Sequence, residues 1–173
     1  MELPELAEIV ENMIVQHDYP GYEIRSLKLG LPDAALRSHA RVFAQALGHE
    51  SVFVKLVALR YFQEKPGLAK SYLNAICGLL DSPDSWVRME ATRTLERIQS
   101  PPENTATKLS PLLKDDDIEV RKTAAKALGK VCSKMKTKDD AVIQALHDAA
   151  EDKDAGVRWK AQKALRLIGE YES

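Results

Sequence analysis

The residues that most often carry out chemistry in proteins are few and dispersed in this chain of 173 residues. The histidines and cysteines stand far apart in sequence, at His17, His39, His49, His147, Cys77 and Cys132. There is no CxxC or HExxH pattern, no GxSxG nucleophile pattern and no glycine-rich phosphate loop. We therefore predict no catalytic residue, no metal site and no cofactor. Both cysteines fall within apolar helical patterns, which is typical of buried, reduced thiols.

Basic residues, in contrast, recur at fixed positions. A Val-Lys or Val-Arg pair occurs four times at intervals of 33, 33 and 37 residues, with the basic residue at Lys55, Arg88, Arg121 and Arg158. A second basic residue follows each of these five positions later, at Arg60, Arg93, Lys126 and Lys163. Rows of this kind can bind carboxylates or phosphates, provided that the fold places them on one surface.

The residues around each basic pair predict the helix that positions it. Valine, alanine and a large apolar residue follow one another at intervals of four, which makes one stripe along an α-helix. Ser51, Asp84, Asp117 or Asp154 stands four residues before each basic position, and Ser and Asp are good N-caps. We call these the B helices and expect them at about 51–64, 84–99, 117–134 and 154–170.

Another helical pattern, the A helix, precedes each B helix, at about 33–47, 67–80, 104–113 and 139–150. Pro111 should bend or truncate the third. One such pair cannot bury its apolar face alone, whereas stacked pairs can. We therefore predict an all-α fold, an α-solenoid of antiparallel helix pairs. The single domain, 1–173, would comprise an N-terminal capping helix and irregular connection at 1–32 and repeats at 33–65, 66–100, 101–136 and 137–171.

The segment LLKDDDIEVRKTAAKALGKV, residues 112–131, resembles the HEAT repeat, especially the short form found in phycobilisome-lyase-like HEAT proteins. In that family an aspartate six residues before the arginine forms a hydrogen-bonded ladder with it between successive repeats. Asp115 and Asp152 fit this pattern, whereas Ser82 and His49 depart from it. The resemblance covers about residues 33–170. It implies a structural ladder that comprises Arg88, Arg121, Arg158, Asp115 and Asp152.

A row of basic residues is the candidate binding surface. Arg60, Arg93, Lys126 and Lys163 lie about 160° around the helix from the apolar stripe, so they should face solvent. The resemblance implies that B helices line the concave side of the stack. Four residues earlier, and expected on the same outward face, are Leu56, Met89, Lys122 and Trp159. The alternative is a solvated face in which Glu64, Glu90 and Glu96 neutralise the row.

Three functions follow from these features. The first is a non-enzymatic scaffold or adaptor that binds another protein through an acidic or mixed acidic and apolar segment. The second, implied only by the resemblance, is a subunit of a bilin lyase or chromophore-handling factor. The third is a weak binder of nucleic-acid phosphates, which the net charge of −1 disfavours.

The sequence also predicts the cellular location and the oligomeric state of the protein. The start of the chain lacks the basic and apolar regions of a signal peptide, and no apolar run approaches the length of a membrane span. We therefore expect a soluble, cytoplasmic protein that does not contact membranes. We expect a monomer, with an end-to-end dimer as the alternative.

Overall fold

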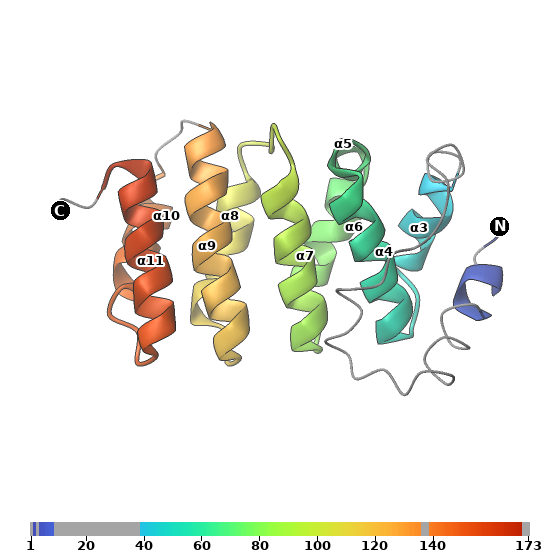
Figure 1. The fold of residues 1–173 in the computed structure, drawn as a ribbon, viewed down its shortest axis with the longest axis horizontal. Helices are drawn as coiled ribbons and strands as arrows, with labels where there is room; N and C mark the ends of the chain where they lie inside the picture. Colours follow the sequence, from blue (N-terminus) through green and yellow to red (C-terminus); the bar gives the residue numbers. More distant parts are fainter. Residues whose placement is uncertain (1, 3, 9–38, 136–138, 171–173) are drawn as a thin grey trace.

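The chain folds into a row of stacked helix pairs (Figure 1). The computed structural model describes residues 2, 4–8, 39–135 and 139–170, and every regular element in these ranges is helical. The long helices lie side by side, with shorter helices behind them. The prediction of an all-α solenoid is therefore confirmed.

The four long helices are the predicted B helices. They are α4 (Val52–Glu64), α7 (Ser85–Arg97), α9 (Ile118–Met135) and α11 (Ala155–Ile168). Each begins one residue after its predicted N-cap. The carboxylates of Asp84 and Asp154 accept hydrogen bonds from the backbone N–H groups of Val87 and Val157, at 3.1 and 3.0 Å. Ser51 makes no such side-chain bond, so only the position of that helix start was predicted correctly.

The A helices lie where they were predicted, but the second is broken into shorter pieces. The first, α3 (Ala40–Ala46), lies within the expected 33–47, of which 33–38 fall outside the described residues. The second was expected to be one helix, which is wrong. It comprises α5 (Pro66–Ala69), η2 (Lys70–Tyr72), α6 (Leu73–Gly78) and η3 (Leu79–Asp81). The backbone at Tyr72 leaves the α region, with φ −116° and ψ 21°, and its ring packs 5.3 Å from that of Phe62.

The remaining A helices are α8 (Thr105–Leu109), η4 (Ser110–Lys114) and α10 (Asp140–Ala149). Pro111 truncates the third as predicted. A proline has no N–H and its ring clashes with the preceding turn, so α8 ends at Leu109 and the chain continues as the 3₁₀ helix η4.

The predicted apolar stripe forms the core. Its twelve side chains are 0% exposed: Val54, Ala58, Phe62, Val87, Ala91, Leu95, Val120, Ala124, Leu128, Val157, Ala161 and Leu165. Residues 4–8 are helical, and Leu6 is buried with the core. The rest of the expected N-terminal cap, and the irregular connection expected after it within 1–32, lie outside the described residues. Among the helices that the structure describes, none is long and apolar enough to cross a membrane.

A close backbone contact joins the B helices α9 and α11. A Cβ at Gly129 would lie 2.8 Å from both Cα and Cβ of Ala164. Because one of these atoms belongs to the backbone, no side-chain rotation could relieve the clash. The glycine therefore sets how closely the two helices approach.

Replacing Gly129 with alanine should destabilise the protein even though alanine favours helices. The higher helix propensity contributes about 1 kcal/mol, but forcing two packed backbones apart costs about 1–3 kcal/mol or more. We expect a lower free energy of unfolding in urea. Gly78→Ala is the matched control, because no atom lies within 4 Å of the added Cβ, and it should leave stability unchanged or slightly higher. Equal effects of the two substitutions would contradict the close contact.

Candidate functional site

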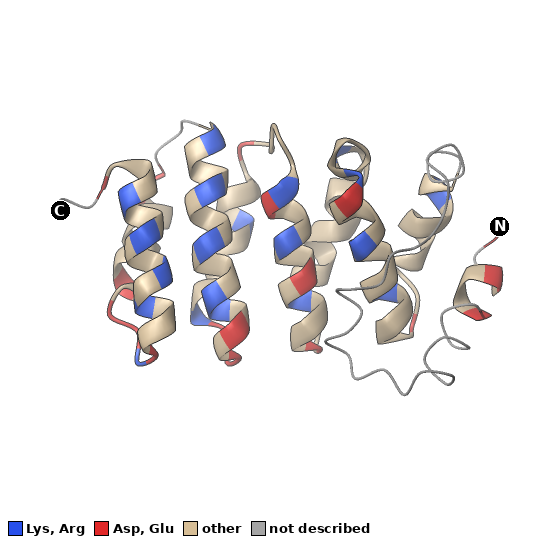
Figure 2. Ribbon diagram, viewed as in Figure 1, with Lys and Arg blue, Asp and Glu red and all other residues tan. Residues whose placement is uncertain are grey.

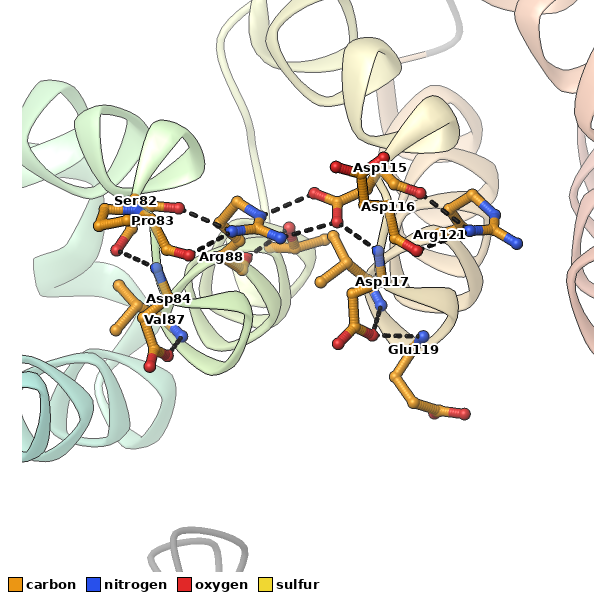
Figure 3. Close-up of polar contacts among 12 residues, drawn as sticks. Ser82, Pro83, Asp84, Val87, Arg88, Asp115, Asp116, Asp117, Glu119 and Arg121 are labelled. Atoms are coloured by element: carbon orange, nitrogen blue, oxygen red, sulfur yellow. Dashed lines mark hydrogen bonds and ion pairs between the residues drawn. The ribbon is translucent and has the colours of Figure 1, made fainter.

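The recurring arginines join neighbouring repeats at the turns between A and B helices (Figure 3). Arg88 donates through Nε and Nη2 to both carboxylate oxygens of Asp115, at 2.7 and 2.8 Å. Its Nη1 donates to the backbone carbonyls of Ser82 and Pro83 in its own turn, at 2.8 and 3.1 Å. One guanidinium thus holds its own turn and the next one together.

The next arginine repeats this arrangement. Arg121 donates to both oxygens of Asp152 at 2.8 and 3.1 Å, and to the carbonyls of Asp115 and Asp116 at 2.9 and 3.2 Å. Arg158 donates hydrogen bonds within its own turn, to the backbone carbonyls of Asp152 and Lys153 at 2.7 and 3.1 Å. The residues named for the ladder are therefore engaged with one another and with the turns.

The residue six positions before the basic residue of each Val-Lys or Val-Arg pair also forms a hydrogen bond within its own turn. Asp115 and Asp152 accept the backbone N–H of the residue two positions later, at 2.9 and 2.8 Å. Ser82 accepts the corresponding bond through Oγ at 3.3 Å, and His49 through Nδ1 at 3.1 Å. The two residues that depart from the family pattern therefore still close the turn, but neither supplies a carboxylate to the preceding repeat.

The ladder changes the acidity of one of its carboxyl groups. Burial alone would raise the pKa of Asp152, but hydrogen bonds from the Arg121 guanidinium and the Asp154 backbone N–H lower that pKa below its ordinary value. Asp152 therefore stays ionised, and holds Arg121, down to a lower pH than a free aspartate would.

The B-helix face carries an excess of positive charge over its C-terminal half (Figure 2). Helix α9 has five Lys and Arg residues and one acid, and α11 has four and none. The acids of this half gather mainly in the turns at 115–117 and 151–154. The net charge of −1 thus conceals a separation of charge between the turns and the B helices.

A groove of about 720 Å³ crosses this face, and we call it the basic groove. It runs over α4, α7 and α9. Its lining comprises Arg60, Gln63, Pro66, Glu90, Arg93, Glu96, Arg97, Gln99, Lys126, Lys130 and Lys134. Six of these side chains are basic and two are acidic. The groove therefore keeps a positive excess even where its charges pair with one another.

The predicted row lies on this face, and three of its members make ion pairs with the acids named in the alternative. Arg60 contacts Glu64 at 3.2 Å, Arg93 pairs with Glu90, and Lys126 contacts Glu96 at 3.1 Å. Lys163, on α11, lies outside the groove with its Nζ 5.2 Å from the centre of the Trp159 ring. Internal pairing thus reduces the charge of the row without cancelling that of the face.

Glu96 is the centre of this pairing. Its side chain is 7% exposed and also contacts Lys130 at 2.6 Å. Burial would raise the pKa of Glu96, but hydrogen bonds from Lys130 and Lys126 lower it below its ordinary value. Lys134 donates to the backbone carbonyls of Glu96 and Ile98, at 2.6 and 2.9 Å, and so caps the end of α7. One buried carboxylate therefore positions two lysines of the groove.

The column expected beside the row is not uniformly exposed. Leu56 and Met89 are only 3% exposed, so the prediction that they face outward is wrong. The contacts of Lys122 explain why this column is partly buried. Its Nζ contacts Asp154 at 3.4 Å, and a Cβ added at Gly156 would lie 2.5 Å from its Cε. The column faces the start of the next B helix. Trp159, on the last B helix that the structure describes, is 51% exposed.

A second, smaller hollow of about 110 Å³ lies between α9 and α11, and we call it the lysine hollow. Its lining comprises Lys126, Lys130, Lys160, Lys163, Gly129, Ala164 and Leu167. The close approach of Gly129 and Ala164 forms its floor. Every polar side chain in this lining ends in an ammonium group.

Sequence reasoning missed several residues of these two sites. Lys130, Lys134, Lys160 and Arg97 line them but were not singled out. The available signal was the spacing of four between Lys122, Lys126, Lys130 and Lys134, which marks a continuous basic strip on one helix. This strip runs along a single helix and does not recur from repeat to repeat, so equivalent positions of the repeats do not reveal it.

Comparison with known proteins finds a likeness to one type of repeat over part of the chain. Residues 106–173 match the family model described as HEAT repeats. This part begins in α8 and contains the Arg121–Asp152 ladder pair. The match is to HEAT repeats in general, and the finer likeness to the phycobilisome-lyase-like form stays a prediction. No curated protein gives a significant match to the chain.

Two crystal structures of engineered proteins have a similar fold. One has a TM-score of 0.56 and 25% identity, over 79% of this chain and 67% of that chain. Another has a TM-score of 0.58 and 25% identity, over 80% of this chain and 40% of that chain. The chain therefore spans less than half of the second protein. Both comparisons support a helical solenoid.

Removing a ladder carboxylate should destabilise the stack. Asp115→Ala leaves the Arg88 guanidinium, which is largely buried, without its charged partner and should lower the free energy of unfolding by about 3 kcal/mol. Asp116→Ala is the control, since that exposed side chain should contribute within about 0.5 kcal/mol. Urea denaturation measures both. A loss for Asp115→Ala as small as that of the control would show that the pair does not hold the repeats together.

The lowered pKa of Asp152 predicts a specific sensitivity to acid. A carboxyl group whose pKa falls on folding stabilises the native state above its unfolded pKa, about 3.9, and this contribution is lost as the pH falls through its folded pKa. Asp152→Asn should therefore reduce stability near neutral pH and lose less on acidification than wild type does. Urea titrations at about pH 7, 5 and 3 measure both trends. Parallel losses in the two proteins would contradict the assignment.

Proposed function

We propose that this protein is a non-enzymatic interaction module that binds an acidic segment of another protein on its B-helix face. The observation that supports this most directly is the lining of the basic groove, with six basic and two acidic side chains. HEAT repeats generally serve as scaffolds for protein interaction, which agrees with this proposal. An extended acidic peptide would meet favourable charge along the groove.

Several polar groups of the basic groove are held in place by hydrogen bonds to one another. Arg97 donates to the backbone carbonyl of Gln63 at 3.2 Å, and Gln63 donates in turn to the carboxylate of Glu90 at 2.8 Å. These bonds fix several polar groups of the floor before any partner arrives. Preorganised charges of this kind contribute to association rate and specificity more than to raw affinity.

Apolar contact would come from the far end of the same face. Trp159 and Leu167 on α11 are 51% and 53% exposed and flank Lys163 in sequence at intervals of four. Leu56 and Met89 are buried and Lys122 pairs with Glu119 at 3.1 Å, so we leave these three out of the proposed surface. A partner with apolar residues beyond its acidic run would cover both regions.

A second candidate function is binding to a nucleic-acid backbone. The nine basic residues and single acid of α9 and α11 favour it. Glu90 and Glu96 in the adjacent groove oppose it, because they would repel a continuous phosphate chain. Salt dependence separates the two candidates, since each phosphate neutralised adds about 0.7–0.9 to the slope of log affinity against log salt concentration.

Charge reversal across the row tests the proposal. The variant carries Arg60→Glu, Arg93→Glu, Lys126→Glu and Lys163→Glu. The control reverses four exposed basic residues on the A helices and turns, with Arg41→Glu, Lys70→Glu, Lys114→Glu and Lys153→Glu. Both have the same net charge, so any difference between them reflects the position of the charge.

The two variants and wild type would be titrated with fluorescent acidic peptide libraries and used in pull-downs from nuclease-treated lysate. We expect the row variant to bind acidic peptides at least about tenfold more weakly, because charge repulsion replaces attraction. The control should bind like wild type, and both should keep native circular dichroism. Equal binding by the row variant and the control would exclude the B-helix face as the site.

A further inference from the structure

We infer that the lysine hollow between α9 and α11 is a binding site for a phosphorylated side chain of a partner peptide. This inference rests on the proposed function and names the chemistry of one part of that surface. The hollow comprises four lysines, a floor of Gly129 and Ala164, and Leu167 at its edge. Its volume of about 110 Å³ suits a small anionic group rather than a large ligand.

The lysines of the hollow come from two helices and are held in two different ways. Lys126 and Lys130 on α9 contact the Glu96 carboxylate at 3.1 and 2.6 Å. Lys160 and Lys163 on α11 have their ammonium groups 4.6 and 5.2 Å from the centre of the Trp159 ring. Within the described residues, no carboxylate lies within ion-pair distance of either lysine on α11. An anion in the hollow would therefore supply a counter-charge that these two lysines lack.

The charge of the hollow favours phosphate over carboxylate. Four ammonium groups together with the Glu96 carboxylate leave an excess of three positive charges. A phosphorylated serine or threonine carries about −1.5 to −2 near neutral pH and has three acceptor oxygens, whereas a carboxylate carries one charge and two oxygens. Lysine ammonium groups act as compact point charges and need no planar, bidentate partner.

The surroundings of the hollow favour a peptide over a nucleic acid. Leu167 at its edge and Trp159 on the same helix offer apolar contact next to the phosphate position. The neighbouring basic groove contains Glu90 and Glu96, which interrupt the positive path that a string of phosphates would follow. A peptide with one phosphate beside apolar residues, followed by its acidic segment, fits both regions.

The test compares three fluorescent peptide libraries that differ only at a fixed central residue: phosphoserine, serine or glutamate. Wild type should bind the phosphoserine library at least about tenfold more tightly than the serine library, because charged hydrogen bonds form only with phosphate. The glutamate library should bind with intermediate affinity. Equal binding of the phosphoserine and serine libraries would overturn the inference.

Two sets of variants locate the binding. Lys160→Gln with Lys163→Gln should weaken phosphoserine binding about tenfold or more, whereas the control, Lys70→Gln with Lys114→Gln, should leave it unchanged. Glu96→Gln should strengthen binding severalfold, because it removes the carboxylate that competes for Lys126 and Lys130. Loss of phosphoserine binding in the control pair, or none in the Lys160 and Lys163 pair, would place the phosphate elsewhere.

A measurement on the wild-type hollow avoids reliance on altered lysines. Trp86 and Trp159 are the two tryptophans of the chain, so Trp86→Phe leaves Trp159 as the only one. Titration with O-phosphoserine should shift its fluorescence saturably, since the two ammonium groups leave the ring, and serine should not. The absence of any shift would contradict the site.

The remaining outcomes separate this inference from the proposed function. If the row variant loses acidic peptides while phosphoserine gives no advantage, only the phosphate site fails. If oligodeoxythymidylate binds more tightly than the phosphoserine library with a steep salt slope, a nucleic acid replaces the peptide as the ligand of the hollow. If neither acidic nor phosphorylated peptides bind, both proposals fail.

Discussion

The architecture depends on how one arginine side chain divides its hydrogen bonds. In Arg88 of α7 and Arg121 of α9, Nη1 donates to carbonyls of the turn that begins the same helix, while Nε and Nη2 donate to the aspartate of the following turn. That aspartate also closes its own turn through a backbone N–H. For α9 and α11, the start of the B helix and its distance from the preceding one are therefore set by one shared carboxylate. Because this junction is polar and largely buried, its geometry must be satisfied in full.

The use of acids in the turns shapes the electrostatics of the whole molecule. Aspartates are placed where helices begin and where the ladder needs them, so few acids of the C-terminal half remain to neutralise the B-helix face. The acids that do pair with basic residues there are Glu90, Glu96 and Glu119, and Glu96 is buried against two lysines of α9. The overall charge of −1 is thus a poor guide to the field that a partner meets on this face.

The sequence was informative where the determinants are local. B-helix starts were predicted to within one residue because capping aspartates and the apolar stripe depend only on nearby residues. The break at Tyr72 was not predicted, since no proline or glycine marks it. Leu56 and Met89 were assigned to the surface from the geometry of one isolated helix. Their burial depends on the neighbouring helix, which a helical wheel does not contain. The same limit hid the lysine hollow, whose residues come from two helices.

The contact between Gly129 and Ala164 has a consequence for binding energetics. Two helices whose backbones touch cannot move closer together, and moving apart would break the packing beneath them. The lysines above this contact are therefore mounted on a rigid base, and only their own side-chain torsions remain free. Ordering an anion there would cost rotamer entropy of a few long side chains and little backbone entropy. A site of this kind would be preorganised at the level of the main chain and adaptable at the level of its ammonium groups.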